Sequence, residues 1–234
     1  MEKLIDILES FNGRNARNEK ELIDKFRNIA DVVINGGYFL INGTAKIFVT
    51  DVEFYFHSER NEQELWKKDF CMYHRGTKEE VPYFPVGSIC PHNSGVDVSF
   101  ENPFEEYRAS FLVRGHRYED GKETYETDKP TYLRENMFGY SNCISGGLNI
   151  RWIDDRSCPQ NELTDDTRIN VSKYDENGKS IKGEKDLRRW RFRIKRQEQG
   201  FRTANVIKYM FPLSCRRGVP SLSRDSHPFW TDTK

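Results

Sequence analysis

The chain has few of the features that mark membrane, secreted or zinc-binding proteins. No window approaches the roughly 18 consecutive apolar residues of a membrane-spanning helix, and charges interrupt the apolar N-terminal residues, which argues against a signal peptide. The five cysteines are odd in number and widely scattered, with no Cys-x-x-Cys pair. Neither a disulfide framework nor a structural zinc site is therefore indicated. We expect a cytoplasmic protein with free thiols and no membrane contact.

Apolar residues are also scarce: 36% of the 234 residues are hydrophobic and 32% are charged. Aromatic residues, at 13%, can still supply a core because each one buries a large area. The length lies near the upper end for one domain, and neither a repeat nor a linker divides the sequence. We predict a single monomeric domain over residues 1–219 and a weakly ordered tail over residues 220–234.

The formal net charge is zero, but the charges are unevenly distributed. Residues 182–217 contain twelve basic and three acidic side chains, a local charge of +9. A basic surface attracts polyanions even when the charges cancel over the whole chain. The segment therefore predicts a polyanionic partner.

Two helices are predicted at the N-terminus. Apolar residues recur at helical spacing in residues 4–11 and again in residues 22–33. Asn18, with Glu21 three positions later, is typical of a capping box that begins the second helix.

A β-hairpin is predicted next, because residues 38–41 and 46–57 resemble strands and enclose the turn signal Asn42-Gly43. Regular alternation along the longer strand divides its side chains between two faces. The core face is predicted to hold Phe48, Thr50, Val52, Phe54 and Phe56, and the opposite face Val49, Asp51, Glu53, Tyr55 and His57.

Four further strands are predicted, in residues 95–100, 109–114, 148–153 and 186–196. Residues 58–94 and 154–184 are predicted to be rich in loops, with a clear reversal at Asp175-Glu176-Asn177-Gly178. Helices followed mainly by hairpin-connected strands indicate an α+β protein.

Three segments carry side chains that are suited to chemistry. A carboxylate such as Glu53, partly desolvated beside Tyr55, has a raised pKa and can act as a general base, although a strand face washed by water is the ordinary alternative. His74 lies among aromatic residues, where a structural role is also common. Arg114 ends an apolar strand, and its planar donor fork can hold a carboxylate or a phosphate.

In this order the segments resemble the alkyladenine-type (methylpurine) DNA glycosylase family. The similarity covers about residues 28–118 and lies in the order and spacing of motifs. The matching motifs are Asp51-Val52-Glu53-Phe54-Tyr55, His74-Arg75-Gly76, Val86-Gly87-Ser88 and Phe111-Leu112-Val113-Arg114-Gly115. The resemblance implies that family's fold, a single domain with a curved antiparallel sheet and N-terminal and flanking helices.

The resemblance also implies an activity, the hydrolytic release of an alkylated or otherwise modified purine from DNA without a metal or other cofactor. Glu53 would activate water, Tyr55 and His74 would hold the flipped nucleotide, and Arg114 would orient Glu53 or the water. Flipping costs a few kcal/mol. Stacking on aromatic rings returns about 1–3 kcal/mol per base.

The family inserts a tyrosine into the duplex from a hairpin tip, and here residues 90–95 occupy that region. Pro91, His92 and Asn93 are the predicted nucleic-acid contacts, since proline can wedge a base step. The changed tip also favours an alternative, a non-catalytic nucleic-acid-binding protein on the same scaffold.

A second predicted contact surface is the basic face of the strand in residues 186–196. Its side chains would lie about 6.5–7 Å apart, comparable with the spacing of phosphates along one DNA strand. Solvated edge strands also use basic side chains to block aggregation. The residues of this face are Arg189, Arg191, Arg193 and Lys195.

A metal-dependent hydrolase is the third hypothesis. Its candidate ligands are Asp51, His57, His74 and His92. Their spacing matches no compact motif such as His-Glu-x-x-His, so no metal site is predicted.

Overall fold

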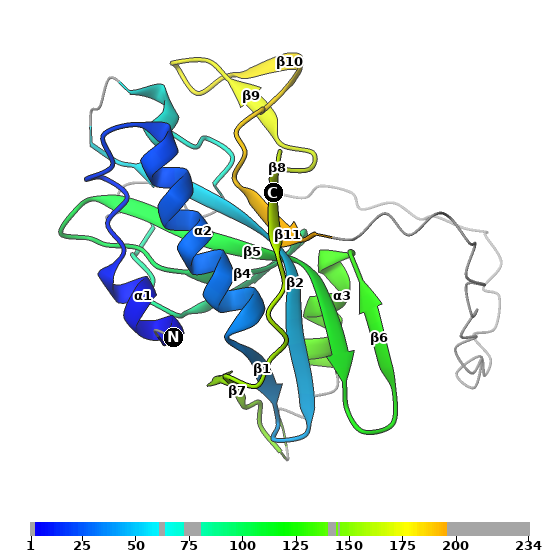
Figure 1. Cartoon of the computed structure of the whole chain (residues 1–234). Helices are drawn as coiled ribbons and strands as arrows, with labels where there is room; N and C mark the ends of the chain where they lie inside the picture. Colours follow the sequence, from blue (N-terminus) through cyan, green and yellow to red (C-terminus); the bar gives the residue numbers. More distant parts are fainter. Residues whose placement is uncertain (1–2, 61–63, 73–80, 140–143, 145, 196–234) are drawn as a thin grey trace, which may run out of the picture. The chain divides into compact units, whose positions relative to one another are not determined.

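Three α-helices and a curled antiparallel sheet make up the described part of the protein (Figure 1). The structure is a computed structural model that describes residues 3–60, 64–72, 81–139, 144 and 146–195. The predicted α+β class is therefore confirmed. The predicted domain end at residue 219, the tail and His74 lie outside the described residues. No helix within the described ranges is long and apolar enough to cross a membrane.

The two predicted N-terminal helices are present as α1 (Leu4–Ser10) and α2 (Glu19–Asn35). Asn18 caps α2, because its side-chain oxygen accepts a hydrogen bond from the Glu21 backbone N–H at 3.0 Å. The apolar face of α2 packs on the sheet, where the ring of Phe26 stacks on Phe54 at 4.6 Å between centroids.

The main sheet has nine strands within the described residues, in the order β3-β4-β5-β2-β1-β7, with β6 beside β5 and with β11 between β2 and β8. Its strands are β1 (Gly37–Ile41), β2 (Ala45–Ser58), β3 (Ile89–His92), β4 (Gly95–Ser99), β5 (Tyr107–Glu119), β6 (Thr124–Thr127), β7 (Ile150–Asp154), β8 (Leu163–Asp166) and β11 (Arg191–Ile194). A separate hairpin pairs β9 (Ser172–Tyr174) with β10 (Ser180–Lys185).

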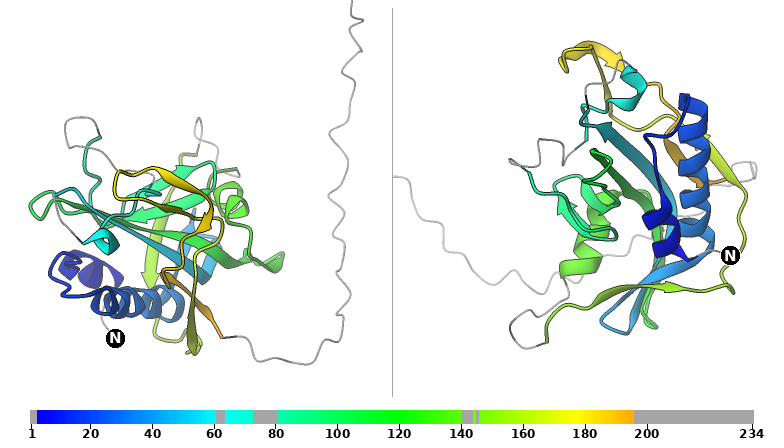
Figure 2. Two further views of the ribbon diagram at one scale, coloured as in Figure 1. Left: turned by 90° about the horizontal axis from the view of Figure 1, so that it is seen from above. Right: turned by 90° about the vertical axis from the view of Figure 1, so that its left-hand side faces the viewer.

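The two faces of the sheet have different covers. Helices α1 and α2 lie against one face, and α2 contacts β1, β2 and β11. The short helix α3 (Pro130–Arg134) contacts β4 and β5 and lies on the other face (Figure 2). A single turn of π-helix (Glu135–Gly139) continues α3, and a short 3₁₀ turn (Leu65–Lys67) follows β2.

The alternation of β2 is interrupted by a bulge. Val49 pairs with His116, but Asp51 pairs with Gly115, so Thr50 is an extra residue in the ladder. The core face is consequently formed by Ile47 and Val49 before the bulge and by Val52, Phe54 and Phe56 after it. The prediction that Phe48 faces the core and that Val49 faces away from it is wrong. A regular period of two cannot anticipate an inserted residue.

The partner strand has its own irregularity at the same place. Val52 pairs with Val113 and Asp51 with Gly115, which leaves Arg114 unpaired between them. A Cβ atom on Gly115 would lie 2.9 Å from the Thr50 hydroxyl, so glycine permits the close approach of the two strands. The double irregularity places Arg114 beside Glu53.

Residues 154–184 contain three strands, although a loop-rich segment was predicted. β8 extends the main sheet by pairing with β11, and the β9–β10 hairpin turns at the predicted reversal, where Gly178 N–H bonds to Asp175 O at 3.1 Å. The prediction failed for β8 because Leu163-Thr164-Asp165-Asp166 has only one apolar side chain. β11 is also shorter than the strand predicted in residues 186–196.

Candidate active site

Glu53 lies in the middle of the sheet, on the face opposite α2. It pairs with Leu112 on β5 and with Arg191 on β11, and its side chain has no solvent exposure. Burial raises the pKa of this carboxyl, because the charged form loses its hydration. Glu53 therefore has the property expected of a general base.

Three groups hold the Glu53 carboxylate in place. Its Oε1 accepts a hydrogen bond from the Ile169 backbone N–H at 2.7 Å, and its Oε2 accepts one from the Tyr55 hydroxyl at 3.2 Å. The Nε of Arg114 lies 3.9 Å from Oε1. The Ile169 bond and the charge of Arg114 oppose the effect of burial, yet the pKa of Glu53 stays above its ordinary value.

A cavity of about 720 Å³ opens over Glu53. It lies between β2 and β5, the tip of the β3–β4 hairpin, the start of α3 and the segment that leads into β9. Rings, polar groups and one arginine surround the carboxylate. The lining residues are Glu53, Tyr55, Phe70, Cys71, Met72, Asn93, Ser94, Leu112, Arg114, Thr131, Ile169, Asn170, Val171 and Tyr174.

Arg114 is the cation of this cavity. It makes no hydrogen bond within the described part of the chain, and its buried Nε has no hydrogen-bond partner there. Its ion-pair contact is the Glu53 carboxylate, whose Oε1 lies 3.9 Å from Arg114 Nε. The donor fork of Arg114 is thus available to a ligand beside the carboxylate.

The structure brings together four of the predicted site residues, namely Glu53, Tyr55, Arg114 and Asn93. His74 lies outside the described residues. Pro91 is exposed on β3, away from the turn at the tip.

His92 is held within the hairpin by hydrogen bonds. Its Nδ1 accepts a hydrogen bond from the Ser94 N–H at 3.2 Å, so its Nε2 carries the proton and donates to Asp97 at 3.0 Å. Asn93 and Ser94 form the two-residue turn, and both border the cavity. The structure therefore places Asn93, rather than Pro91 or His92, at the edge of the cavity.

The predicted basic face, which runs from Arg189 through β11 to Lys195, is not a row of free cations. All four of its basic side chains form ion pairs with carboxylates on β2, on β8 or just before β8. The pairs are Arg189–Asp165 (2.5 Å), Arg191–Asp51 (through Nε at 3.0 Å), Arg193–Asp166 (3.2 Å) and Lys195–Glu162 (2.6 Å). The prediction of a basic surface open to phosphates is therefore wrong for these four side chains. Two of the carboxylates, Asp165 and Asp166, belong to β8, the strand that the sequence did not predict.

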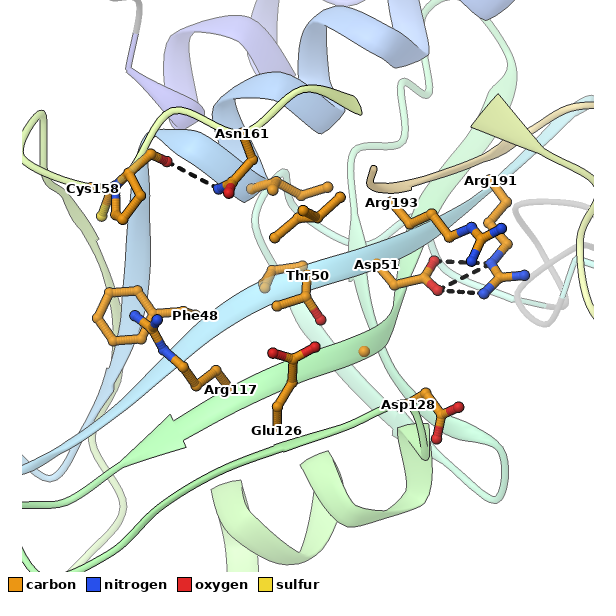
Figure 3. A pocket seen from close by; sticks show the side chains of 15 residues that line it. Phe48, Thr50, Asp51, Arg117, Glu126, Asp128, Cys158, Asn161, Arg191 and Arg193 are labelled. Atoms are coloured by element: carbon orange, nitrogen blue, oxygen red, sulfur yellow. Dashed lines mark hydrogen bonds and ion pairs between the residues drawn. The ribbon is translucent and has the colours of Figure 1, made fainter. Parts of the chain in front are cut away.

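A second cavity, of about 380 Å³, lies beside the β2 bulge (Figure 3). Its lining carries mixed charges, with Arg117, Glu126 and Arg193 around Thr50 and Asp51. Figure 3 shows the Asp51 carboxylate bonded to a neighbouring guanidinium, that of Arg191.

The metal-hydrolase hypothesis finds no site within the described ranges, where no three His, Cys, Asp or Glu side chains lie close enough to hold a metal ion. Asp51 is held in its ion pair, and the ring of His57 contacts Phe70 while its Nδ1 lies 3.1 Å from Asp69 O.

Several site residues were missed by the sequence reasoning. Phe70, Asn170 and Tyr174 line the cavity, and Ile169 contributes its backbone N–H. A backbone donor leaves no trace in residue type, and Tyr174 and Asn170 lie in the segment that was predicted to be loop-rich.

Comparison of the chain with protein-family models, with curated proteins and with solved structures finds no match.

Proposed function

We propose that the cavity over Glu53 binds a modified purine nucleotide and that Glu53 activates water to hydrolyse its N-glycosyl bond. The observation that carries the proposal is a fully buried carboxylate with a raised pKa on a cavity that also presents Arg114 and the ring of Tyr174. We also propose that the fold is a divergent form of the methylpurine-DNA glycosylase fold, with DNA as the polymer. The three described cysteines are free thiols, in keeping with the cytoplasmic location that we propose.

The reaction needs few protein groups. The water oxygen bonds to the anomeric carbon of the sugar, the glycosyl bond breaks, and its electron pair leaves with the base. The water proton passes to Glu53. An alkylated purine carries positive charge, so it leaves as a neutral base and gains from contact with aromatic faces. General-base action of this kind contributes about 10²–10⁴ in rate.

The remaining groups have separate roles in this scheme. Ile169 N–H fixes Oε1 of Glu53, which leaves Oε2 as the proton acceptor. The Tyr55 hydroxyl covers Oε2, so the attacking water enters by displacing it. Arg114 stabilises the ionised carboxylate and offers donors to the sugar or phosphate.

The test is an assay of base release from DNA that carries alkylated, deaminated or oxidised purines, in single strands and in duplexes. Hot alkali cleaves each abasic site, so strand scission reports release. We expect release from at least one alkylated substrate, with no requirement for added metal. Absence of abasic product from every substrate would contradict the enzymatic function.

One observation favours the alternative of a non-catalytic binder on the same scaffold. Both oxygens of Glu53 already accept hydrogen bonds, and the side chain has no exposed surface. Such a carboxylate can serve to hold Ile169 and Tyr55 around a ligand. Salt-dependent binding of a modified nucleotide without any abasic product would support this alternative. Absence of binding at low salt would contradict both functions.

A further inference from the structure

Arg168 lies at the centre of a largely buried ion network. The side chains of Arg168 and Asp69 have no solvent exposure. Both terminal nitrogens of Arg168 donate hydrogen bonds to the Asp69 carboxylate, and the bond from Nη2 is 3.4 Å long. Nη2 also donates to Asp186 at 2.6 Å, and Nη1 donates to Phe54 O at 3.1 Å. One guanidinium thus joins three segments that are distant in the sequence.

The network extends to the rings on both sides of Arg168. Its guanidinium carbon lies 4.8 Å from the centroid of Tyr55 and 5.0 Å from that of Trp190. Arg188 covers the same indole at 4.1 Å and donates to Asp186. A guanidinium held by two carboxylates and two rings has one accessible orientation, because breaking a buried pair leaves an uncompensated charge.

The residues that follow Arg168 form a wall of the Glu53 cavity. Ile169 donates its N–H to Glu53, and Asn170 adopts a left-handed conformation with φ of 59°. Val171 is buried, and its carbonyl accepts the Asp186 N–H at 2.9 Å. The ion network and this backbone bond therefore hold the segment on both sides of the donor that fixes Glu53.

We infer that Arg168 is a positioning residue of the proposed active site, which aims the Ile169 N–H at Glu53 Oε1 through its contacts with Asp69 and Asp186. The inference rests on the proposed function for its catalytic meaning. It also gives a role to residues after about position 118, where the resemblance to the glycosylases ends. These residues complete the cavity and hold the Glu53 carboxylate in place.

The other charged or titratable groups around Glu53 are Arg114 on β5, Arg191 on β11 and Tyr55, which lies on β2 with Glu53. The Tyr55 ring also lies against the Arg168 guanidinium. Loosening the network therefore disturbs the packing of Tyr55 and weakens the Ile169 hydrogen bond. That bond lowers the pKa of Glu53, so its loss raises the pKa further.

The test uses Arg168→Lys, which keeps the positive charge but loses the planar fork that spans two carboxylates. We expect the pKa of Glu53 to rise by about one unit, a tenfold change in its protonation equilibrium. The measurement is a ¹³C NMR titration of the Glu53 carboxyl in the full chain without ligand. Arg189→Lys is the matched control, because Arg189 pairs with Asp165 away from the cavity and should leave the titration unchanged.

Asp186→Asn is the second variant. This substitution weakens the ion pair between Arg168 and residue 186 while retaining the shape of the side chain. If Arg168→Lys does not fold, the Glu53 pKa of Asp186→Asn tests the positioning role instead. A raised Glu53 pKa in a folded variant supports the positioning role. An unchanged Glu53 pKa in folded Arg168→Lys, or in folded Asp186→Asn when Arg168→Lys fails to fold, overturns it. The titration requires no turnover, so failure of base release by the wild type would contradict the proposed function and leave this result standing.

Discussion

Arg191 on β11 binds Asp51 on β2 through a two-pronged ion pair, in which Arg191 Nε lies 3.0 and 3.1 Å from the two carboxylate oxygens and Arg191 Nη2 makes a further contact. Both side chains are largely buried, at 11% and 9% exposure. Burial raises the pKa of Asp51 even though Arg191 opposes the shift. The pair joins β11 to the bulged part of β2, next to Glu53.

Removal of Arg191 should therefore be costly. Arg191→Met leaves Asp51 buried without its partner, and we expect the free energy of unfolding to fall by about 3–5 kcal/mol in urea titrations. Arg193→Met is the control, because its pair with Asp166 is exposed and should contribute less than about 1 kcal/mol. A double variant, Asp51→Leu with Arg191→Met, should recover most of the loss. Equal stability of the two single arginine variants would contradict the buried pair.

The two cations that flank β11, Arg189 and Lys195, should contribute little to nucleic-acid binding. Arg189 and Lys195 are engaged with Asp165 and Glu162, so the double variant Arg189→Ala, Lys195→Ala should keep the affinity and its salt dependence. Arg114→Met, in the cavity, should reduce the slope of log K against log salt by about one. The measurement is fluorescence anisotropy at several salt concentrations. A larger slope change in the β11 double variant than in Arg114→Met would favour the basic face predicted from the sequence.

Glu101 should make the stability depend on pH. Its side chain is buried, Oε2 accepts the Phe84 N–H at 2.8 Å, and Oε1 has no hydrogen-bond partner within the described residues. Burial raises the pKa of Glu101 from 4.5 to about 7. The folded state thus holds this proton more tightly than the unfolded chain. The stabilisation of the folded state by protonated Glu101 is therefore complete below pH 4.5 and is lost as the pH rises to about 7.

The loss across this window is roughly 3 kcal/mol, from 1.36 kcal/mol per pKa unit. Glu101→Gln should flatten the dependence of unfolding free energy on pH between 4.5 and 7. Glu123→Gln, at an exposed position, should leave the dependence unchanged. The same slope in Glu101→Gln and in the wild type would show that another group titrates.

The sequence was sufficient to predict elements whose signals are local. Helical spacing and the Asn18 cap predicted α1 and α2, and Asn42-Gly43 predicted the β1–β2 turn. The strand that carries Glu53 and the apolar strand before Arg114 were also correct in position. Each of these features depends on residues a few positions apart.

Features that depend on distant partners could not be predicted in this way. The bulge at Thr50 changes which side chains of β2 face the core, and it arises from pairing with β5, about 65 residues away. β8 has a polar sequence, and its place in the sheet depends on pairing with β11, about 28 residues later in the chain. The hydrogen bond from Ile169 to Glu53 spans 116 positions and involves a backbone group that every non-proline residue possesses.

Tyr174 should contribute to affinity by stacking on a bound base. Tyr174→Ala should weaken binding of a nucleotide with a modified purine by about 1–3 kcal/mol, or roughly 5- to 150-fold in Kd, whereas Tyr174→Phe should retain most of the affinity. Tyr132→Ala is the matched control, because Tyr132 is exposed on α3 and does not line the cavity. Isothermal titration calorimetry gives the dissociation constants of the wild type and the three variants. Equal affinity of Tyr174→Ala and the wild type would place the base elsewhere.

The central claim is that the Glu53 carboxylate activates water, and the most direct test is single-turnover base release by Glu53→Gln. The substituted amide can still accept from Ile169 through its oxygen and can donate to the Tyr55 hydroxyl through its nitrogen, so the fold and ligand binding should persist. We predict that saturating enzyme releases base about 10²–10⁴ times more slowly than the wild type, with unchanged affinity. Release at the wild-type rate by this variant would contradict the account.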